Sequence, residues 1–394
     1  RSCRPSPLTL LAATGPPALP AADTSIGKLK PDTSSRCTFF PKAMSNNLIM
    51  PAKTRLSPIE LLRIVAMFLI LIQHVNYQAT AWIRADDFHT TLLPTVTRVV
   101  IEQTAVCAVN LFVLISGWFS IHVKRESLFT LLVQYFFFAT VLLVFPGLSD
   151  ACSPGDLKDP IRQVVTFDCF WFVPAYLMLC PLSPGLNAFV EQGNRRTVRA
   201  FIVAFFVFQT VWGWALGDAA SGMFSCGYSA ISFTGLYLLA RYVRLYRPRP
   251  FQLRACLQYL IAGMLIALPD LASFIAAFAW RGGLFDAWYG RSILYSAPHV
   301  ILCATARLHF TSQWINKVAA SAFAVYLFHL HPCVFPYFKQ ATQWLYGHYS
   351  GAAYLLLTFG FLVTVFAAAV LVDQIRILCW RPLARRLEFL SAIL

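Results

Sequence analysis

The chain has 394 residues, of which 58% are hydrophobic and only 12% are charged, and its mean hydropathy is +0.61. A soluble core has no room for so many apolar side chains, so lipid must be the main solvent, and the composition predicts an all-α, polytopic transmembrane helical bundle. The net charge of +15 would suggest nucleic acid in a soluble protein. Here we assign it to cytoplasmic connections and expect membrane lipid, and no nucleic acid, as a partner.

The first 43 residues differ from the rest of the chain. They are rich in Pro, Ser, Thr and Ala and show no hydrophobic periodicity. We interpret residues 1–43 as a disordered or non-native N-terminal extension, because they lack the cleavage-site pattern of a signal peptide. Met44 is a plausible start, since the chain leads from there directly into the first apolar run. Residues 44–394 are therefore predicted to form the membrane-embedded domain.

Apolar runs of about twenty residues predict ten membrane-spanning helices. They lie near residues 59–77, 100–121, 128–147, 169–188, 198–216, 224–241, 256–279, 290–306, 318–337 and 351–377. Lys and Arg test this count, because they accumulate in the cytoplasmic connections of membrane proteins. From Met44 onward, 18 of them, including Arg376, fall in one alternate set of connections and 7 in the other. This asymmetry predicts that the N-terminus and the C-terminus both face the cytoplasm.

The sequence shows little sign of metal or cofactor chemistry. The 11 cysteines lie mostly inside apolar runs without paired metal-ligand spacing, and no Walker-type or dinucleotide glycine pattern occurs. We expect neither a metal nor a bound cofactor. Any chemistry is then expected among the helices or at their ends.

The first apolar run, IELLRIVAMFLILIQHV, contains Arg63 and His74. Eleven positions correspond to about 1100°, so the two residues share one helix face, about 16 Å apart along the axis. Ionisable groups on such a face are costly unless they face a cavity or the bundle interior. A guanidinium near the cytoplasmic edge suits a phosphate, and a deeper imidazole suits a general base or a transient acyl acceptor. The structural alternative is an anchoring arginine and a hydrogen-bonded core histidine.

This pattern resembles the acyltransferase 3 family of integral-membrane enzymes that acylate surface polysaccharides. Their first helix bears an Arg, ten residues and then a His, preceded by an acidic residue that Glu60 matches. Three further segments resemble the family in the same order. They are a phenylalanine-rich helix ending in Ser-Gly, a tryptophan-led helix and a late helix with Tyr and His: NLFVLISGWF at 110–119, WFVPAYLMLCPL at 171–182 and SAFAVYLFHLHP at 321–332.

The resemblance implies a function. An acyl group, usually acetyl, would pass from cytoplasmic acyl-CoA to a hydroxyl of a cell-surface or exported glycan, in an O-acetyltransferase reaction. His74 would be the catalytic residue, and Arg63 its donor-binding or structural partner. The membrane domain would act alone or hand the acyl group to a separate protein of unknown identity. The closest resemblance is to bacterial enzymes, so we expect a multi-pass protein of the bacterial cytoplasmic membrane.

Three further candidates for the donor or substrate site remain open to a structural interpretation. Glu60 could orient Arg63 through an ion pair at i and i+3. Ser116, beside Gly117, could line the site or only allow close helix packing. Trp171 could stack on a sugar or belong to the interfacial aromatic belt.

The late apolar run offers two more candidates, Tyr326 and His329, which share a face at i and i+3. His331 points about 200° away from His329, so at most one of these histidines can line a given cavity. A hydrogen-bonded structural role for His329 is the alternative. Asp270, after Pro269, could line a pathway, or the run could break there near the surface.

Two other functions also fit a chain with many spans. A transporter or flippase for a lipid-linked glycan would use interrupted helices and an interior Asp, but no inverted repeat is visible in the sequence. A membrane sensor would use the fold only to bind a ligand. Neither explains the spacing of Arg63 and His74, so we favour the acyltransferase.

Overall fold

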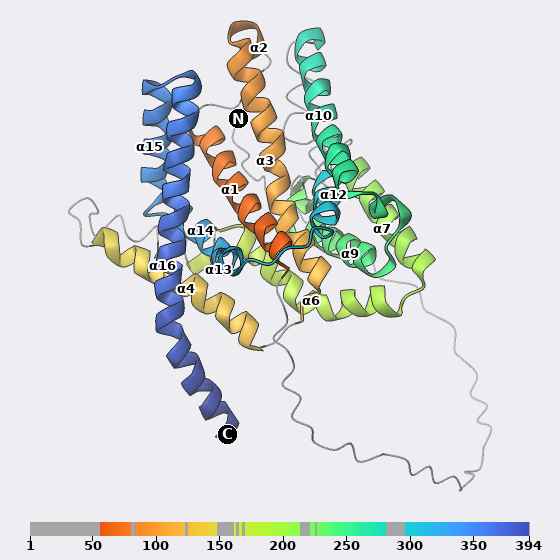
Figure 1. The fold of residues 1–394 in the computed structure, drawn as a ribbon, viewed down its shortest axis with the longest axis vertical. Helices are drawn as coiled ribbons and strands as arrows, with labels where there is room; N and C mark the ends of the chain where they lie inside the picture. Colours follow the sequence, from red (N-terminus) through yellow and green to blue (C-terminus); the bar gives the residue numbers. More distant parts are fainter. Residues whose placement is uncertain are drawn as a thin grey trace, which may run out of the picture. The chain divides into compact units, whose positions relative to one another are not determined.

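The computed structural model describes ten stretches of the chain, separated by short gaps: residues 56–79, 83–84, 86–122, 125–147, 161–162, 165–167, 170–212, 221–224, 227–280 and 296–393. Every regular element among them is a helix (Figure 1). The predicted all-α class is thus confirmed for the described residues. The predicted extension, residues 1–43, and Met44 lie outside them.

The helices follow one another along the chain with short connections. In order they are α1 (Ser57–Ala79), α2 (Asp87–Thr90), α3 (Leu92–Phe119), α4 (Arg125–Gly147), α6 (Phe172–Gln192), α7 (Arg195–Thr210), α8 (Ser221–Phe224), α9 (Ala230–Tyr246), the 3-10 helix η4 (Arg249–Gln252), α10 (Ala255–Trp280), α12 (Ser296–Thr305), α13 (Gln313–Ala319), α14 (Ala322–His329), α15 (Phe335–His348) and α16 (Gly351–Ile393).

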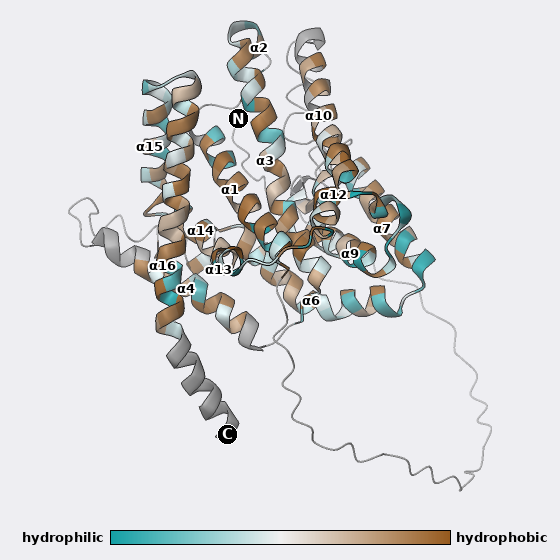
Figure 2. Cartoon of the chain, viewed as in Figure 1, coloured by the Kyte–Doolittle hydropathy of each residue, from teal (hydrophilic) through white to brown (hydrophobic). Residues whose placement is uncertain are grey.

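Four described helices are long and apolar enough to cross a membrane: Ser57–Asn76, Leu92–Phe119, Phe172–Gln192 and Gly351–Trp380. Two shorter apolar stretches lie in α4 and α10. Apolar residues predominate along these helices, whereas hydrophilic residues gather where α7 begins and α9 ends (Figure 2). The chain is therefore a membrane protein, while the count of ten spans and the cytoplasmic termini remain predictions.

The centre of the bundle is built on α3, which packs against α1 on one side and α9 on the other. Helix α1 runs antiparallel to α3, since Gln73 bonds Glu102 whereas Asn76, further along α1, bonds the carbonyl of Arg98, earlier on α3. The contact with α9 depends on Gly117. A Cβ atom there would lie 2.5 Å from the carbonyl oxygen of Tyr237, so only glycine allows this approach.

Polar side chains fasten the same region. Tyr237 of α9 donates its hydroxyl hydrogen to Asn187 of α6 at 2.8 Å and accepts the backbone N–H of Ile121 at 2.9 Å. Asn187 in turn donates to the carbonyl of Ile121 at 3.2 Å. This closed ring of hydrogen bonds satisfies the backbone just beyond the end of α3 and holds three helices in register.

The apolar run predicted to form one span over residues 318–337 is instead broken. Helix α13 ends at Ala319, α14 covers only Ala322–His329, and α15 begins at Phe335. Pro332 cannot donate a helical hydrogen bond, and the chain turns there through bonds from Val334 and Phe335 to the carbonyl of His331. Hydropathy alone does not detect such a break. Its consequence is that His329 stands in the last turn of α14.

The last helix differs from prediction in a second way. Helix α16 continues to Ile393, well beyond the predicted end at residue 377. Arg376, which the sequence assigned to a cytoplasmic connection, is buried within this helix and pairs with Asp373 at 2.7 Å. Helix α10 likewise continues through Pro269 and Asp270, although the side chain of Asp270 lies outside the described ones.

Candidate active site

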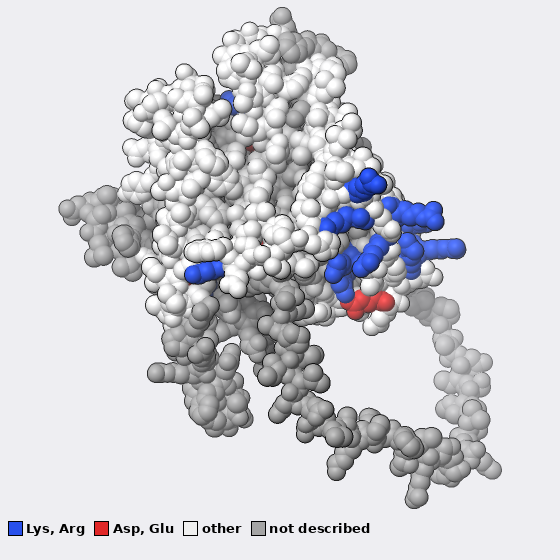
Figure 3. Space-filling model, in the orientation of Figure 1, with Lys and Arg blue, Asp and Glu red and all other residues white. Residues whose placement is uncertain are grey.

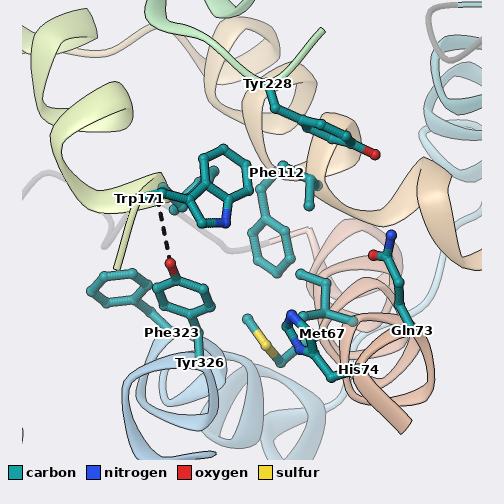
Figure 4. A pocket seen from close by; sticks show the side chains of 11 residues that line it. Met67, Gln73, His74, Phe112, Trp171, Tyr228, Phe323 and Tyr326 are labelled. Carbon is teal, nitrogen blue, oxygen red and sulfur yellow. Dashed lines mark hydrogen bonds between the residues drawn. The ribbon is translucent and has the colours of Figure 1, made fainter. Parts of the chain in front are cut away.

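A cavity of about 270 Å³ opens between α1, α3, α6 and α14, and most of its wall is aromatic or aliphatic (Figure 4). The polar exceptions on α1 are Gln73 and His74. Met67, Ile70 and His74 line it at successive helical spacings, so the face of α1 that carries His74 is the face turned into the cavity. The predicted cavity beside His74 is therefore present.

His74 contacts the second histidine that the sequence singled out. Its Nδ1 lies 2.9 Å from Nε2 of His329, and the two ring centroids are 5.0 Å apart. His329 is fully buried, and its Nδ1 lies 2.6 Å from the carbonyl oxygen of Val325, one turn earlier on α14. The short helix α14 thus orients His329, and His329 orients His74.

This chain of contacts sets the positions of the protons. A carbonyl oxygen only accepts, so Nδ1 of His329 carries the hydrogen, and the Nε2 of neutral His329 then accepts from Nδ1 of His74. Neutral His74 is left with a lone pair on Nε2, which has no hydrogen-bond partner among the described residues. An imidazole held in this tautomer, beside a cavity, is suited to take a proton or to attack an electrophile.

Arg63 lies outside the cavity, one turn before Met67 on the same face of α1. Its guanidinium pairs with Glu60 at 2.5 Å, the i, i+3 pair that the sequence suggested. The Arg63 side chain is 26% exposed, whereas that of Glu60 is 8% exposed. Arg63 therefore keeps part of its charge accessible at the end of α1 from which the helix leads towards His74.

The remaining candidates occupy the wall of the cavity or the layer behind it. Trp171 and Tyr326 both line it, and the hydroxyl of Tyr326 accepts the backbone N–H of Phe172 at 3.4 Å (Figure 4). Ser116 does not line the cavity. Its hydroxyl donates to the carbonyl of Phe112 and lies 3.0 Å from the hydroxyl of Tyr176, which links α3 to α6.

His331 is directed elsewhere, but it lies beyond the end of α14, so the helical separation of about 200° does not apply to it. Its Nδ1 accepts the backbone N–H of Cys333 at 3.2 Å, and its ring lies near Phe170, 6.5 Å between centroids. It stabilises the turn after α14 and contributes nothing to the cavity lining. The two neighbouring histidines thus divide into one that contacts His74 and one that supports the break in the run.

A polar cluster beside His74 was not predicted from the sequence. Gln73, which lines the cavity, donates to the fully buried carboxylate of Glu102 at 3.3 Å, and Asn76 donates to the same carboxylate at 2.8 Å. The Nε of Arg98 donates to Asn76 at 3.3 Å. A Glu inside an apolar run was the available signal, because buried carboxylates in membranes need partners.

Among the described residues, no group of three or more His, Cys, Asp or Glu side chains is placed to hold a metal ion.

The fold and the site together define a helical membrane protein with an oriented histidine pair at an internal cavity. The sequence pattern of the acyltransferase 3 family, described as an acyltransferase domain, matches residues 57–374. The chain therefore belongs to the acyltransferase 3 family and is an acyltransferase, which confirms the resemblance. No curated protein and no solved structure matches the chain.

Proposed function

We propose that this protein transfers an acyl group, acetyl in the first instance, from acyl-CoA to a hydroxyl of a cell-surface or exported glycan, with His74 as the catalytic residue. The observation that carries the proposal is the contact of His329 with His74, which lines the cavity. It supplies a nitrogen lone pair in a region otherwise lined by apolar groups. The site of action would be the cytoplasmic membrane of a bacterium.

The transfer follows from this geometry in one sequence of steps. Nε2 of His74 takes the proton of the acceptor hydroxyl as its oxygen forms a bond to the thioester carbonyl carbon. The tetrahedral intermediate then collapses, the carbon–sulfur bond breaks, and the departing thiolate recovers the proton from the His74 imidazolium. In the variant with a covalent step, Nε2 itself bonds the carbonyl carbon, and the thiolate leaves as the carbon–sulfur bond breaks. The acceptor hydroxyl then attacks the acyl-imidazole, its proton passes to the thiolate, and the carbon–nitrogen bond breaks to restore neutral His74.

The donor would approach along α1. Sites for drug-sized ligands usually measure about 300–1,000 Å³, so the 270 Å³ cavity suits the acyl thioester end of the donor rather than a whole coenzyme A. A donor with its acyl end at His74 extends past Met67 towards Arg63, roughly 16 Å away along the helix. A guanidinium there suits a phosphate group of the donor.

The acceptor would meet an aromatic surface. Trp171 lines the cavity, is 39% exposed, and packs its ring against Tyr228 with 5.5 Å between centroids. Sugar rings present C–H faces that stack on such side chains, while Gln73 offers an amide to a hydroxyl. Which glycan binds, and whether a second protein completes the transfer, are matters for acceptor trials with the purified enzyme.

The test compares three histidine variants of the detergent-purified protein with radiolabelled acetyl-CoA. We expect His74→Gln to lower label transfer to acceptor, or label release as acetate, by about 10²–10⁴-fold, the usual contribution of a general base. His329→Gln should also lower the rate, though less, because Nε2 of His74 survives without its fixed tautomer. His331→Gln is the matched control, since this neighbouring buried histidine bonds the backbone of Cys333, whereas His329 bonds His74.

Binding is measured in parallel on each variant. Loss of transfer in His74→Gln with unchanged acetyl-CoA affinity and unchanged melting temperature supports chemistry at His74. The proposal would be contradicted if the wild type binds acetyl-CoA but transfers label no faster than His74→Gln. If the wild type neither binds nor consumes acetyl-CoA, acetyl is the wrong donor group, and longer acyl-CoA donors take its place in the same assay.

A further inference from the structure

A cluster of arginines lies away from the histidine pair, where α7 begins and α9 ends (Figure 3). It combines two basic segments of the chain, Arg195, Arg196 and Arg199 in the first and Arg241, Arg244, Arg247, Arg249 and Arg254 in the second. Helix α7 packs on α9 and α6. No residue of the cluster lines the cavity at His74.

Part of this cluster surrounds a groove. A hollow of about 330 Å³ lies between α7, α9 and the turn that contains η4. Arg195, Arg199 and Arg249 line its polar side, whereas Ile202, Val203 and Leu239 line its apolar side. The groove thus combines cationic and aliphatic groups, and on α7 Ile202 and Val203 lie one helical turn beyond Arg199.

The positive charge of the arginines that line the groove is not neutralised by nearby carboxylates among the described residues. Among the described residues, none of Arg195, Arg199 and Arg249 pairs with a carboxylate, and the nearby Glu191 is taken by Arg241. Burial, and then the charges of Arg247 and Arg241, lower the pKa of Arg244 below its ordinary value. The positive end of the α7 helix dipole adds to the same field, since its first turn carries no acidic residue.

The arginine side is also rigid. Arg247 ends α9 in the left-handed conformation with φ 42°, and its N–H bonds the carbonyl of Val243 at 3.0 Å. Prolines at 248 and 250 flank Arg249 and restrict the backbone of the turn. The side-chain amide of Gln252 donates to the carbonyl of Arg247. Because the backbone of this turn is already fixed, a ligand that binds Arg249 does not have to order it, and no backbone entropy is lost on binding.

The apolar side continues onto the outer surface of α7. Val203 and Val207 are 56% and 57% exposed, and Phe201 and Phe208 are about half exposed. Exposed aliphatic and aromatic side chains on a helix of a membrane protein face acyl chains. A ligand with its headgroup among the arginines could therefore extend its tails along α7 without leaving an apolar environment.

From this arrangement we propose that the α7–α9 groove binds an anionic phospholipid, with the headgroup phosphate on Arg195, Arg199 and Arg249 and the acyl chains along Val203 and Val207. Clusters of Lys and Arg beside a membrane helix recognise anionic headgroups by this combination of charge and apolar contact. The inference is independent of the acyl-transfer chemistry, since it uses none of the residues that line the cavity at His74.

Coenzyme A also carries phosphates, so it is the rival ligand for the arginines. The groove favours lipid because a nucleotide would leave the aliphatic wall and the exposed face of α7 without an apolar partner. A nucleotide would also depend on the arginines alone. The two ligands are therefore separable by substitution of the aliphatic side of the groove.

The experiment titrates the full-length protein in neutral detergent with dioleoyl phosphatidylglycerol or dioleoyl phosphatidylcholine and counts bound lipid by native mass spectrometry. The groove variant is Arg199→Gln with Arg249→Gln. The matched control is Arg196→Gln with Arg254→Gln, which removes the same charge from the same cluster but outside the groove lining. We expect phosphatidylglycerol affinity to fall roughly 25-fold in the groove variant, about fivefold for each arginine, and less than about threefold in the control.

Two further arms decide between the ligands. Val203→Asn should weaken phosphatidylglycerol binding and leave coenzyme A binding unchanged, and millimolar coenzyme A should not displace the lipid. Equal losses in the groove and control variants, or equal binding of phosphatidylcholine, would overturn the proposal in favour of diffuse electrostatic attraction. Displacement of lipid by coenzyme A, together with loss of coenzyme A binding in the groove variant, would overturn it in favour of a donor site. All five substituted side chains are exposed, so comparable melting temperatures are expected throughout.

Discussion

Helices α1 and α16 carry the same short pattern in different surroundings. On α1, Glu60 is followed three residues later by Arg63, and on α16, Asp373 is followed by Arg376. The paired nitrogen and oxygen atoms lie 2.5 and 2.7 Å apart. The Arg63 side chain is 26% exposed, whereas Arg376 is 6% exposed and Asp373 is fully buried.

The hydrogen bonds around the two ion pairs also differ, as their exposure does. Oδ1 of Asp373 accepts from Arg376 and also from Gln134 of α4 at 3.0 Å, so this pair holds α4 against α16. Glu60 is the only hydrogen-bond partner of Arg63 among the described residues, which leaves most of its guanidinium available. An identical spacing in the sequence thus yields an interhelical tie in one helix and an accessible cation in the other. Exposure, and not the pattern, distinguishes them.

The largest effect is expected from removal of the buried carboxylate of Asp373. We expect Asp373→Ala to lower the free energy of unfolding by about 3–5 kcal/mol, because it leaves Arg376 buried without its partner. Thermal unfolding in detergent, followed by loss of the monodisperse peak in size-exclusion chromatography, measures this change. Acyl transfer per folded molecule should be unaffected, since neither residue lines the cavity.

A double substitution sharpens that result. Asp373→Ala combined with Arg376→Met removes both charges, and replacing a buried ion pair by apolar groups is often neutral or stabilising. Most of the lost stability should therefore return. A double variant as unstable as the single one would show that Gln134, now without its acceptor, and not the unpaired Arg376, accounts for the loss.

The sequence was sufficient for the helical class but not for the path of every helix. Hydropathy and length identified α1, α3, α6 and α16, which are long and apolar enough to cross a membrane although α6 contains Pro181 and Pro184. The same measure failed over residues 318–337, because the run is apolar throughout and only Pro332 and Pro336 signal the break. It also misjudged Arg376, since a charge inside an apolar run is indistinguishable from a loop charge until its buried partner is known.

The candidate site could be predicted only where its residues are local in sequence. Helical spacing on α1 relates Glu60, Arg63 and His74, and of these three His74 lines the cavity. The partner of His74 is 255 positions away, and no spacing rule brings His329 to it. Similarly, Gln73 and Glu102 meet through the packing of α1 on α3. Long-range contacts of this kind require the fold, although a buried Glu in an apolar run signals that a partner exists.

The accessible pair is tested by Arg63→Ala. If Arg63 binds a donor phosphate, this change should raise the KM for acyl-CoA by roughly 10–100-fold, since a hydrogen bond to a charged group contributes about 1.5–3 kcal/mol. The melting temperature should change little, in contrast to Asp373→Ala. Arg63→Lys should recover only part of the loss, because a lysine cannot form the bidentate contact. A large fall in melting temperature with an unchanged KM would instead show that Arg63, like Arg376, stabilises the packing of helices.

The smallest effect is expected from Glu60→Gln. The amide keeps the size of the side chain and an oxygen that can accept from Arg63, so the guanidinium loses orientation and charge pairing but not its place at the end of α1. An ion pair with a partly exposed partner contributes about 1 kcal/mol or less, so donor KM should rise by no more than about fivefold at unchanged kcat. Isothermal titration with a non-hydrolysable acyl-CoA analogue separates this loss of affinity from any loss of turnover. A fall in kcat at unchanged affinity would mean that Glu60 acts on the reacting groups through the α1 face it shares with His74. The pair on α1 would then be part of the chemistry rather than a device for holding the donor.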